Sequence, residues 1–130
     1  MIPRITLQIQ SCPESLNRVD KFLCDLKKIY DIGEEIYCNI LMAVREAVTN
    51  AIKHGNKFDT EKLINIAVFQ DKNLCVFSIE DEGDGFDYSK IKNSILNIGG
   101  MGISLMKKLS RHLRFYKDGR CVKMFFYTKQ

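Results

Sequence analysis

The hydrophobic residues of this chain recur first with the period of a strand and then with the period of a helix. Ile5, Leu7 and Ile9 alternate with polar residues across 4–10, which predicts a half-buried strand. From about residue 14 to 30 the apolar positions recur at steps of three and four, as in an amphipathic helix. They are Leu16, Val19, Phe22, Leu23, Leu26, Ile29 and Tyr30.

A second helical pattern runs from about residue 34 to 54, after a break at 31–33. Its apolar positions again follow the helical period and form one stripe. Gly55 comes directly after the pattern, and we predict that it ends the helix in the left-handed conformation. The stripe consists of Ile40, Leu41, Val44, Val48, Ala51 and Ile52.

The opposite face of this second helix is polar and could carry chemistry. Glu46, Asn50 and His54 share that face, because four residues make slightly more than one helical turn. Ala43 and Ala47 flank it, which leaves room for a group to approach the backbone. A carboxylate and an amide one turn apart can ligate a hard cation, or one can ligate while the other positions a nucleophile. The alternative is a solvated surface, with His54 placed favourably near the C-terminal dipole.

The remainder of the chain predicts two hairpins and a third helix. Runs rich in β-branched and aromatic residues are separated by turn sequences such as Asp118-Gly119, a strong hairpin signal. Weak periodicity at 87–98 predicts a mobile segment. The expected elements are a hairpin of 62–70 with 74–80, a helix from Ile103 to about Ser110, and a hairpin of 112–117 with 121–128.

This succession of elements indicates an α+β fold. The order is β-α-α-β-β-lid-α-β-β, where the lid is the segment 87–98. Strands paired as hairpins, with helices gathered between them, favour a two-layer sandwich with helices on one face of a mainly antiparallel mixed sheet. A length of 130 residues favours a single domain over 1–130.

Composition and charge narrow the function classes without naming one. No apolar run approaches the roughly 18 residues that span a bilayer, and the N-terminus lacks a signal-peptide core, so no membrane association is expected. Five scattered cysteines without a CxxC pair fit reduced thiols in a cytoplasmic protein. The net charge is +4, with a mild basic concentration in Lys107, Lys108, Arg111 and Arg114. Because no aromatic or glycine pattern accompanies it, this concentration favours a solvated helix face over nucleic-acid binding.

Two glycine-rich turns add candidate ligand contacts. In the turn 81–85 the glycines let the backbone come close to a flat ligand, and Asp81 can accept a hydrogen bond from an exocyclic amine. The run Gly99-Gly100-Met101-Gly102 opens a predicted helix, where backbone N–H groups and the helix dipole favour phosphate. An acidic β-turn and a glycine loop with a helix cap are the ordinary alternatives. The Walker pattern is absent, so this is not a P-loop.

The order and context of these motifs resemble the GHKL ATPase superfamily of gyrase-type topoisomerases, heat-shock chaperones, sensor histidine kinases and mismatch-repair ATPases. The shared features are Glu-xxx-Asn on a helix, Asp-x-Gly-x-Gly after a hairpin, and Gly-x-Gly at a helix start. The order of elements also matches, over nearly the whole chain. Within the superfamily, the run 46–55 is similar to the anti-sigma-factor serine kinases of bacteria (RsbW-like). Histidine kinases usually have asparagine at the position of Glu46.

The resemblance implies a site for ATP and Mg²⁺ on the polar face of the second helix. Asn50 would ligate Mg²⁺ that bridges the ATP phosphates. Glu46 would be the base that orients or deprotonates a serine hydroxyl on a protein substrate. The segment 87–98 would be a lid that folds over ATP.

The resemblance also implies roles for the two glycine-rich turns. Asp81 would recognise the adenine amine. The remaining residues would shape the adenine pocket or meet the phosphates at the start of the third helix. They are Gly83 and Gly85 at the adenine, and Gly100, Met101 and Gly102 at the phosphates.

The chain departs from the family pattern at two places. Members often carry an arginine in the lid or beside Gly-x-Gly, able to contact the terminal phosphate, but the run 97–102 has none. Lys90 or Lys92 could substitute, although the motif places neither. The family also commonly has a Gly-Thr pair in the last hairpin, whereas here Gly119 is followed by Arg120. These departures support ATP binding more firmly than efficient catalysis.

The leading hypothesis is therefore an ATP-dependent serine kinase that acts as an anti-sigma factor in a cytoplasmic partner-switching system. It would bind a sigma factor and phosphorylate a serine on a small anti-anti-sigma protein of the STAS type. The resemblance also suggests a homodimer. One alternative is a regulatory module that binds ATP and sequesters a partner without catalysis. Another is a detached histidine-kinase-like ATPase domain, against which Glu46 argues.

Overall fold

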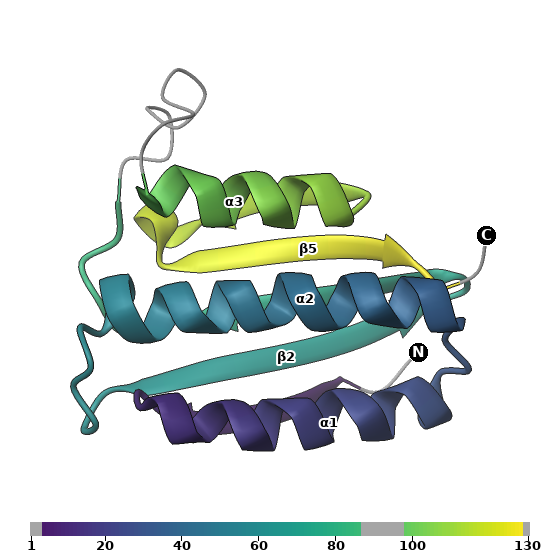
Figure 1. Cartoon of the computed structure of the whole chain (residues 1–130), viewed down its shortest axis with the longest axis horizontal. Helices are drawn as coiled ribbons and strands as arrows, with labels where there is room; N and C mark the ends of the chain where they lie inside the picture. The colour runs from purple at the N-terminus through teal and green to yellow at the C-terminus, as the bar shows by residue number, and fades with distance from the viewer. Residues whose placement is uncertain (1–3, 87–97, 129–130) are drawn as a thin grey trace.

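The computed structural model describes residues 4–86 and 98–128, which form a five-stranded sheet and three α-helices (Figure 1). The α-helices are α1 (Leu16–Ile29), α2 (Glu34–Asn50) and α3 (Ile98–Leu109). The strands are β1 (Ile5–Gln10), β2 (Leu63–Asp71), β3 (Leu74–Glu80), β4 (His112–Tyr116) and β5 (Cys121–Tyr127). Three short helical turns join them: η1 (Pro13–Ser15), η2 (Ala51–Gly55) and η4 (Lys117–Gly119).

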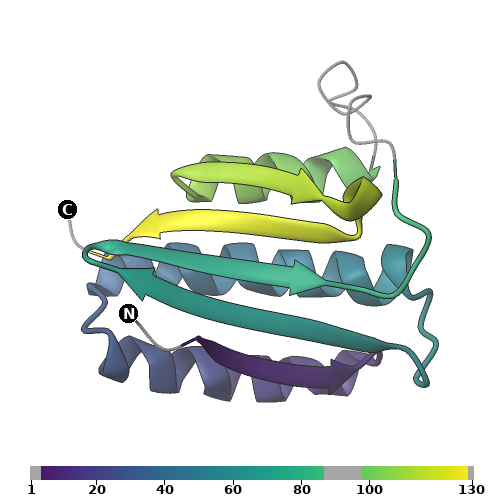
Figure 2. The same cartoon turned by 180° about the vertical axis from the view of Figure 1, so that it is seen from behind.

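The strands form one sheet in the order β1-β2-β3-β5-β4. Each neighbouring pair among the described strands is antiparallel, and the two predicted hairpins are β2–β3 and β4–β5. The helices cover one face of the sheet in Figure 1, and Figure 2 shows the other face without helices. The predicted α+β two-layer sandwich is therefore confirmed, and its sheet is antiparallel throughout the described strands.

Apolar side chains fill the space between the helices and the covered face of the sheet. Most of the predicted stripes of α1 and α2 point into this layer, with Leu23, Val44 and Val48 at 0–1% exposure. Ile29, which the prediction also placed in the α1 stripe, is 63% exposed at the end of the helix, so that assignment was wrong. Fully burying such a side chain contributes about 1.5–3 kcal/mol, so the layer holds α2 firmly against the sheet. The sheet contributes Ile9, Ile64, Ile66, Val68, Phe77, Ile79, Met124 and Phe126.

The start of α3 and its packing on α2 differ from the predictions. The helix begins at Ile98, five residues before Ile103, so the glycine run lies in its first turns rather than ahead of it. Ala43 and Ala47 are buried in the core, and α3 packs against α2. The room that these alanines leave is filled by protein, so the prediction of an open approach to the α2 backbone was wrong there.

The prediction of a left-handed Gly55 was also wrong. The helix α2 passes directly into the π-helical turn η2, and the following residue, Asn56, has right-handed dihedrals (φ −90°, ψ −4°). Gly55 itself does not have a positive φ, and left-handed residues come later, at Lys57 and Phe58. Glycine at position 55 therefore has another cause, which is the close approach of a carboxylate described below.

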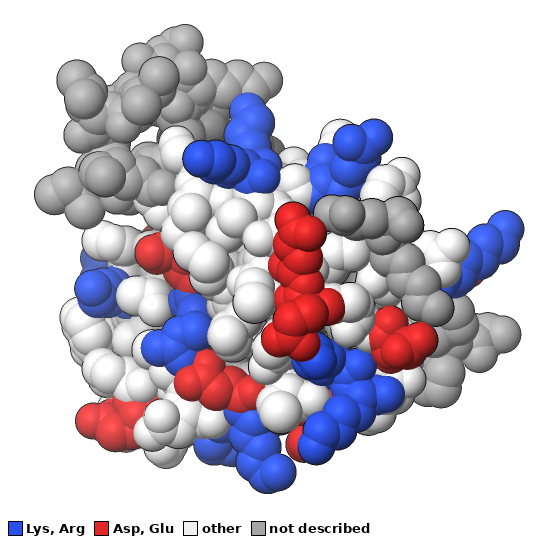
Figure 3. Space-filling model, turned by 45° about the vertical axis from the view of Figure 1, so that its right-hand side comes forward, with Lys and Arg blue, Asp and Glu red and all other residues white. Residues whose placement is uncertain are grey.

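Charges of both signs share the molecular face drawn in Figure 3. Lysine and arginine side chains alternate there with aspartate and glutamate, instead of forming the continuous basic stripe that captures nucleic acid electrostatically. The expectation of no direct nucleic-acid binding stays a prediction. Among the helices that the structure describes, none combines the length and apolar character needed to cross a bilayer.

Candidate functional site

The polar face of α2 meets the first turns of α3. A Cβ atom built on Gly102 would lie 3.1 Å from Asn50 Nδ2 and 3.3 Å from Glu46 Cδ. Glycine at this position therefore lets α3 come close to the amide and the carboxylate. Both side chains are half-buried, whereas His54, one turn further along, is exposed. The structure thus brings Glu46 and Asn50 together with Gly102 and leaves His54 outside the group.

The acidic turn after β3 reaches the C-terminal end of the same helical segment. A Cβ atom built on Gly55 would lie 2.3 Å from Asp81 Oδ2, which is closer than real Cβ atoms approach other atoms. A Cβ atom built on Gly83 would lie 2.1 Å from the carbonyl oxygen of Gly55. Close packing around the Asp81 carboxylate therefore requires glycine at both positions.

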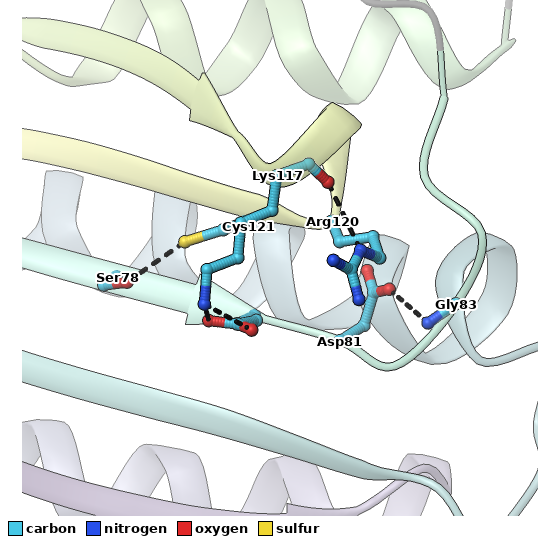
Figure 4. A network of polar contacts seen from close by, with 7 residues as sticks. Ser78, Asp81, Gly83, Lys117, Arg120 and Cys121 are labelled. Atoms are coloured by element: carbon cyan, nitrogen blue, oxygen red, sulfur yellow. Dashed lines mark hydrogen bonds and ion pairs between the residues drawn. The ribbon is translucent and has the colours of Figure 1, made fainter.

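Hydrogen bonds and burial set the state of Asp81. Its N–H donates to the carbonyl oxygen of Arg120 at 2.9 Å. Its Oδ1 accepts from the Gly83 N–H at 2.8 Å (Figure 4). Burial raises the pKa of the Asp81 carboxyl, and the Gly83 hydrogen bond and the nearby Arg120 charge oppose that rise. The carboxylate is thus partly desolvated, which strengthens a hydrogen bond that it accepts from a ligand.

The far end of the acidic turn is held by η4. Gly85 has a φ of +81°, and a Cβ atom built on it would lie 2.1 Å from the carbonyl oxygen of Asp118. That same oxygen accepts a hydrogen bond from the Phe86 N–H at 2.9 Å. Lys117 and Asp118 also have positive φ angles, of 53° and 58°, which non-glycine residues avoid. The strained turn is therefore kept in place by its contact with the acidic turn.

One buried residue that the sequence did not single out joins the acidic turn to the sheet. Asn56 Oδ1 accepts from the Glu82 N–H at 2.8 Å, while Nδ2 donates to Ser11 Oγ at 2.7 Å and to the Leu63 carbonyl oxygen at 3.1 Å. The Leu63 N–H in turn donates to the Glu82 carboxylate. Gly55-Asn56 after a helix is an ordinary turn pair, so no pattern separated this asparagine from a solvated one.

The two groups lie along one helical segment. Asn50 ends α2 and Gly55 ends the π-helical turn η2 that follows it, so the two residues lie at opposite ends of one helical turn. The carboxylate of Asp81 sits at one end of this stretch, and the pair of Glu46 and Asn50 sits at the other. The segment therefore presents an acceptor for a flat base at one end and polar ligands facing a helix start at the other.

The predicted phosphate-binding residues and the predicted lid lie mostly where the structure gives no side-chain description. Gly100 and Met101 lie in the first turns of α3, but the structure describes neither the burial of these two residues nor the side chain of Met101. The predicted lid 87–98, with Lys90 and Lys92, lies outside the described residues apart from its last residue. Their proposed contacts with the phosphates stay predictions.

Metal binding by protein side chains alone is not built into the described part of the chain. Residues 4–86 and 98–128 contain no group of three or more His, Cys, Asp or Glu side chains placed to hold a metal ion. Mg²⁺, however, commonly binds one or two protein oxygens together with substrate phosphates and water. The amide of Asn50 and the carboxylate of Glu46, both facing the start of α3, fit that shared mode.

Comparison with known proteins shows which protein family the chain belongs to. The family described as "Histidine kinase-like ATPase domain" matches residues 9–126, which is nearly the whole chain. The chain belongs to this family. The described fold and the order of the three motifs follow the GHKL pattern that the sequence predicted.

Curated relatives of this ATPase domain include serine-protein kinases. The chain is 35% identical over 104 residues to the serine-protein kinase RsbW of Staphylococcus epidermidis, and 36% identical over 104 residues to that of Staphylococcus aureus strain JH9. Each alignment covers 68% of this chain and 64% of the relative. The chain therefore spans less than two thirds of the curated relatives that it matches.

A solved structure has the same fold. The crystal structure of the RsbU and RsbW domains of Rv1364c from Mycobacterium tuberculosis aligns with a TM-score of 0.70 over 98% of this chain and 32% of that one. The sequence identity is 16%, so this likeness concerns the fold alone.

Proposed function

We propose that this chain is an ATP-dependent serine kinase that acts as an anti-sigma factor in a cytoplasmic partner-switching system. It would sequester a sigma factor and phosphorylate a serine on a STAS-type anti-anti-sigma protein. The observation that carries the proposal is the juxtaposition of Glu46 and Asn50 at the start of α3, on the helical segment whose end packs against Asp81. The serine kinases among its relatives support the choice of reaction.

The proposed nucleotide lies along this segment. Asp81 accepts a hydrogen bond from the adenine amine, with Gly83 and Gly85 allowing the backbone to pass close to the base. The phosphates face Gly100, Met101 and Gly102 at the start of α3, where backbone N–H groups and the helix dipole favour negative charge. Asn50 would hold Mg²⁺, which neutralises charge on the phosphates when bound.

The proposed chemistry needs positioning more than covalent assistance. In phosphoryl transfer the protein forms no covalent bond that the transition state requires, so its main role is to orient the serine hydroxyl toward the terminal phosphate. Glu46 is one turn before Asn50, so its carboxylate can accept the hydroxyl proton beside the phosphate end of the site. The hydroxyl oxygen then attacks the terminal phosphorus, and ADP leaves.

The test is transfer of labelled phosphate from Mg-ATP to a purified cognate STAS protein. The variant Glu46→Gln keeps the shape of the side chain and removes the base, so we expect the transfer rate to fall about 10²–10⁴-fold. Glu35→Gln is the matched control, because Glu35 is an exposed glutamate on the same helix. Transfer by Glu46→Gln at the wild-type rate would contradict the assignment of the base.

A second candidate function is a binding module that holds ATP or ADP and sequesters a partner without catalysis. The specific observation in its favour is the run 97–102, which lacks the arginine that often contacts the terminal phosphate in this family. Ordinary nucleotide affinity together with no transfer to any STAS partner would favour this module. Phosphate that reaches histidine, and is therefore acid-labile, would instead indicate a histidine-kinase-like domain.

A further inference from the structure

Arg120 stands directly across from Asp81 where β3 and β5 end. The last ladder pair of these strands joins Glu80 to Cys121, and the hydrogen bond from the Asp81 N–H to the Arg120 carbonyl oxygen extends the pairing by one residue. Residues opposed across an antiparallel pair have Cβ atoms about 4.5–5.5 Å apart. The main chain therefore fixes Arg120 as a neighbour of the proposed adenine acceptor.

The side chain of Arg120 turns toward that acceptor. Figure 4 shows its guanidinium beside the Asp81 carboxylate, and its positive charge acts to lower the pKa of that carboxyl. A hydrogen bond orients the guanidinium, because its Nε–H donates to the Lys117 carbonyl oxygen at 3.3 Å. Among the described residues this is the one side-chain hydrogen bond of Arg120, and it uses Nε rather than the terminal Nη groups.

The two side chains together offer an acceptor next to a donor. Asp81 Oδ1 accepts from the Gly83 N–H and Oδ2 packs against Gly55, and the ionised carboxylate still has lone pairs with which to accept a hydrogen bond from a ligand. The Watson–Crick edge of adenine presents the matching pair, with the N6 amine as donor and the ring nitrogen N1 as acceptor. Guanine presents the reverse pattern at these two positions, an oxygen at C6 and a hydrogen on N1, so it opposes both side chains.

We propose that Arg120 is a second adenine-reading residue, whose guanidinium donates to N1 while Asp81 accepts from the N6 amine. This inference rests on the proposed nucleotide site. It gives a role to the position at which the sequence departs from the Gly-Thr pair of the family. A guanidinium adds a charge-assisted hydrogen bond to the base and thereby sharpens selection of adenine over guanine.

The test replaces one atom of the ligand and one side chain of the protein. Binding of ADP, 1-deaza-ADP and 7-deaza-ADP, each with Mg²⁺, is measured by calorimetry for the wild type, Arg120→Met and Arg120→Lys. In 1-deaza-ADP a C–H group replaces N1, whereas 7-deaza-ADP changes an edge that Arg120 does not face. Arg114→Met is the control for loss of an arginine, since Arg114 is exposed on β4.

The proposal predicts that loss of the ligand's N1 weakens binding only when residue 120 is arginine or, in part, lysine. The wild type and Arg114→Met bind 1-deaza-ADP about ten-fold or more weakly than ADP, the range expected for a hydrogen bond to a charged group. Arg120→Met binds the two ligands within about two-fold of each other, and Arg120→Lys retains part of the difference. The 7-deaza analogue shows no such dependence on residue 120.

Different results would overturn the role of Arg120 and the proposed function. If the wild type binds ADP and 1-deaza-ADP equally, or if Arg120→Met pays the same penalty as the wild type, the role of Arg120 is overturned while the nucleotide site stands. If the wild type binds no adenine nucleotide at all, the proposed function itself is overturned.

Discussion

At position 55 the chain has room for a hydrogen atom where any other residue carries a side chain. The Asp81 carboxylate occupies that room, with Oδ2 2.3 Å from where a Cβ atom would lie. The end of the helix and the acidic turn therefore fit together only if residue 55 is glycine. This contact, rather than a left-handed conformation, explains the glycine.

The variant Gly55→Ala tests that contact. The added methyl group must displace the Asp81 carboxylate or the turn behind it, so we expect ADP affinity to fall about ten-fold or more. Calorimetry with Mg-ADP measures the loss, and circular dichroism reports whether the fold is kept. Gly33→Ala is the control, because a Cβ atom there meets its nearest neighbour, the Thr128 carbonyl oxygen, at an ordinary 3.8 Å. Unchanged affinity in Gly55→Ala would contradict the packing argument.

The pH dependence of nucleotide binding reports on Asp81. Burial raises the pKa of this carboxyl above the usual 3.8, and the ionised form is the one that accepts from the adenine amine. Affinity is therefore full above the raised pKa and is lost as the pH falls through it, at a higher pH than for an ordinary aspartate. Asp81→Asn should bind weakly with little of this pH dependence. An identical pH profile in both proteins would exclude Asp81 as the titrating acceptor.

The same pKa shift has the opposite sign for stability. Because the folded state holds the Asp81 proton more tightly than the unfolded state, the group favours folding at low pH. This contribution is lost as the pH rises from the unfolded pKa through the raised folded value. The site thus accepts a small cost in stability at neutral pH in return for a desolvated acceptor.

At the residue scale the sequence predicts which polar residues form the candidate site, but not why several of its glycines are needed. Glu46, Asn50 and Asp81 could be selected because their types and spacing indicate ligand chemistry. The role of Asn56 could not be predicted, since its partners come from distant parts of the chain. Its hydrogen bonds to Ser11 and Glu82 span 45 and 26 residues of sequence.

At the scale of elements, Asn56 joins the end of the helical segment to the start of β2 and to the acidic turn after β3. Its side chain is 1% exposed, so each of its hydrogen bonds is made away from water. A buried amide with all its partners from separate segments acts as a clamp. Its loss should therefore loosen the acidic turn as well as the core.

The variant Asn56→Ala leaves those buried partners unpaired, which typically costs about 1–3 kcal/mol for each uncompensated group. We expect the free energy of unfolding to fall by about 2–3 kcal/mol, measured by urea denaturation. Asn65→Ala is the control, because Asn65 is exposed on β2 and its hydrogen bond with Gln8 faces solvent. That change should stay within about 0.5 kcal/mol. Equal effects of the two variants would show that Asn56 is no clamp.

Element types followed from the sequence more readily than element ends. The alternation in β1 and the apolar stripes of α1 and α2 fixed the kind of each element, because burial on one face imposes the period. The start of α3 at Ile98 was missed by five residues, since glycines weaken helical propensity. Packing of α3 against α2 supplies the stability that local propensity does not.

For the whole molecule, the fold explains how one sheet and its helices bring the described parts of the three motifs together. The central strand β3 lies between β2 and β5, and it delivers Asp81 to the edge of the sheet where the helical segment ends. The helices occupy one face of the sheet, and there α2 brings Glu46 and Asn50 next to Gly102 of α3. This arrangement could be predicted from the order of elements, whereas the pairing of Arg120 with Asp81 required the strand register.

The most direct measurement follows the phosphate itself. The full chain is incubated with Mg-ATP and its cognate STAS protein, and the partner is then analysed by mass spectrometry for acid-stable phosphate. We predict one phosphoserine on the STAS protein in the presence of the wild-type chain and a large loss of it with Glu46→Gln. A STAS protein that stays unmodified, while the chain binds Mg-ATP and the sigma factor, would contradict the kinase assignment.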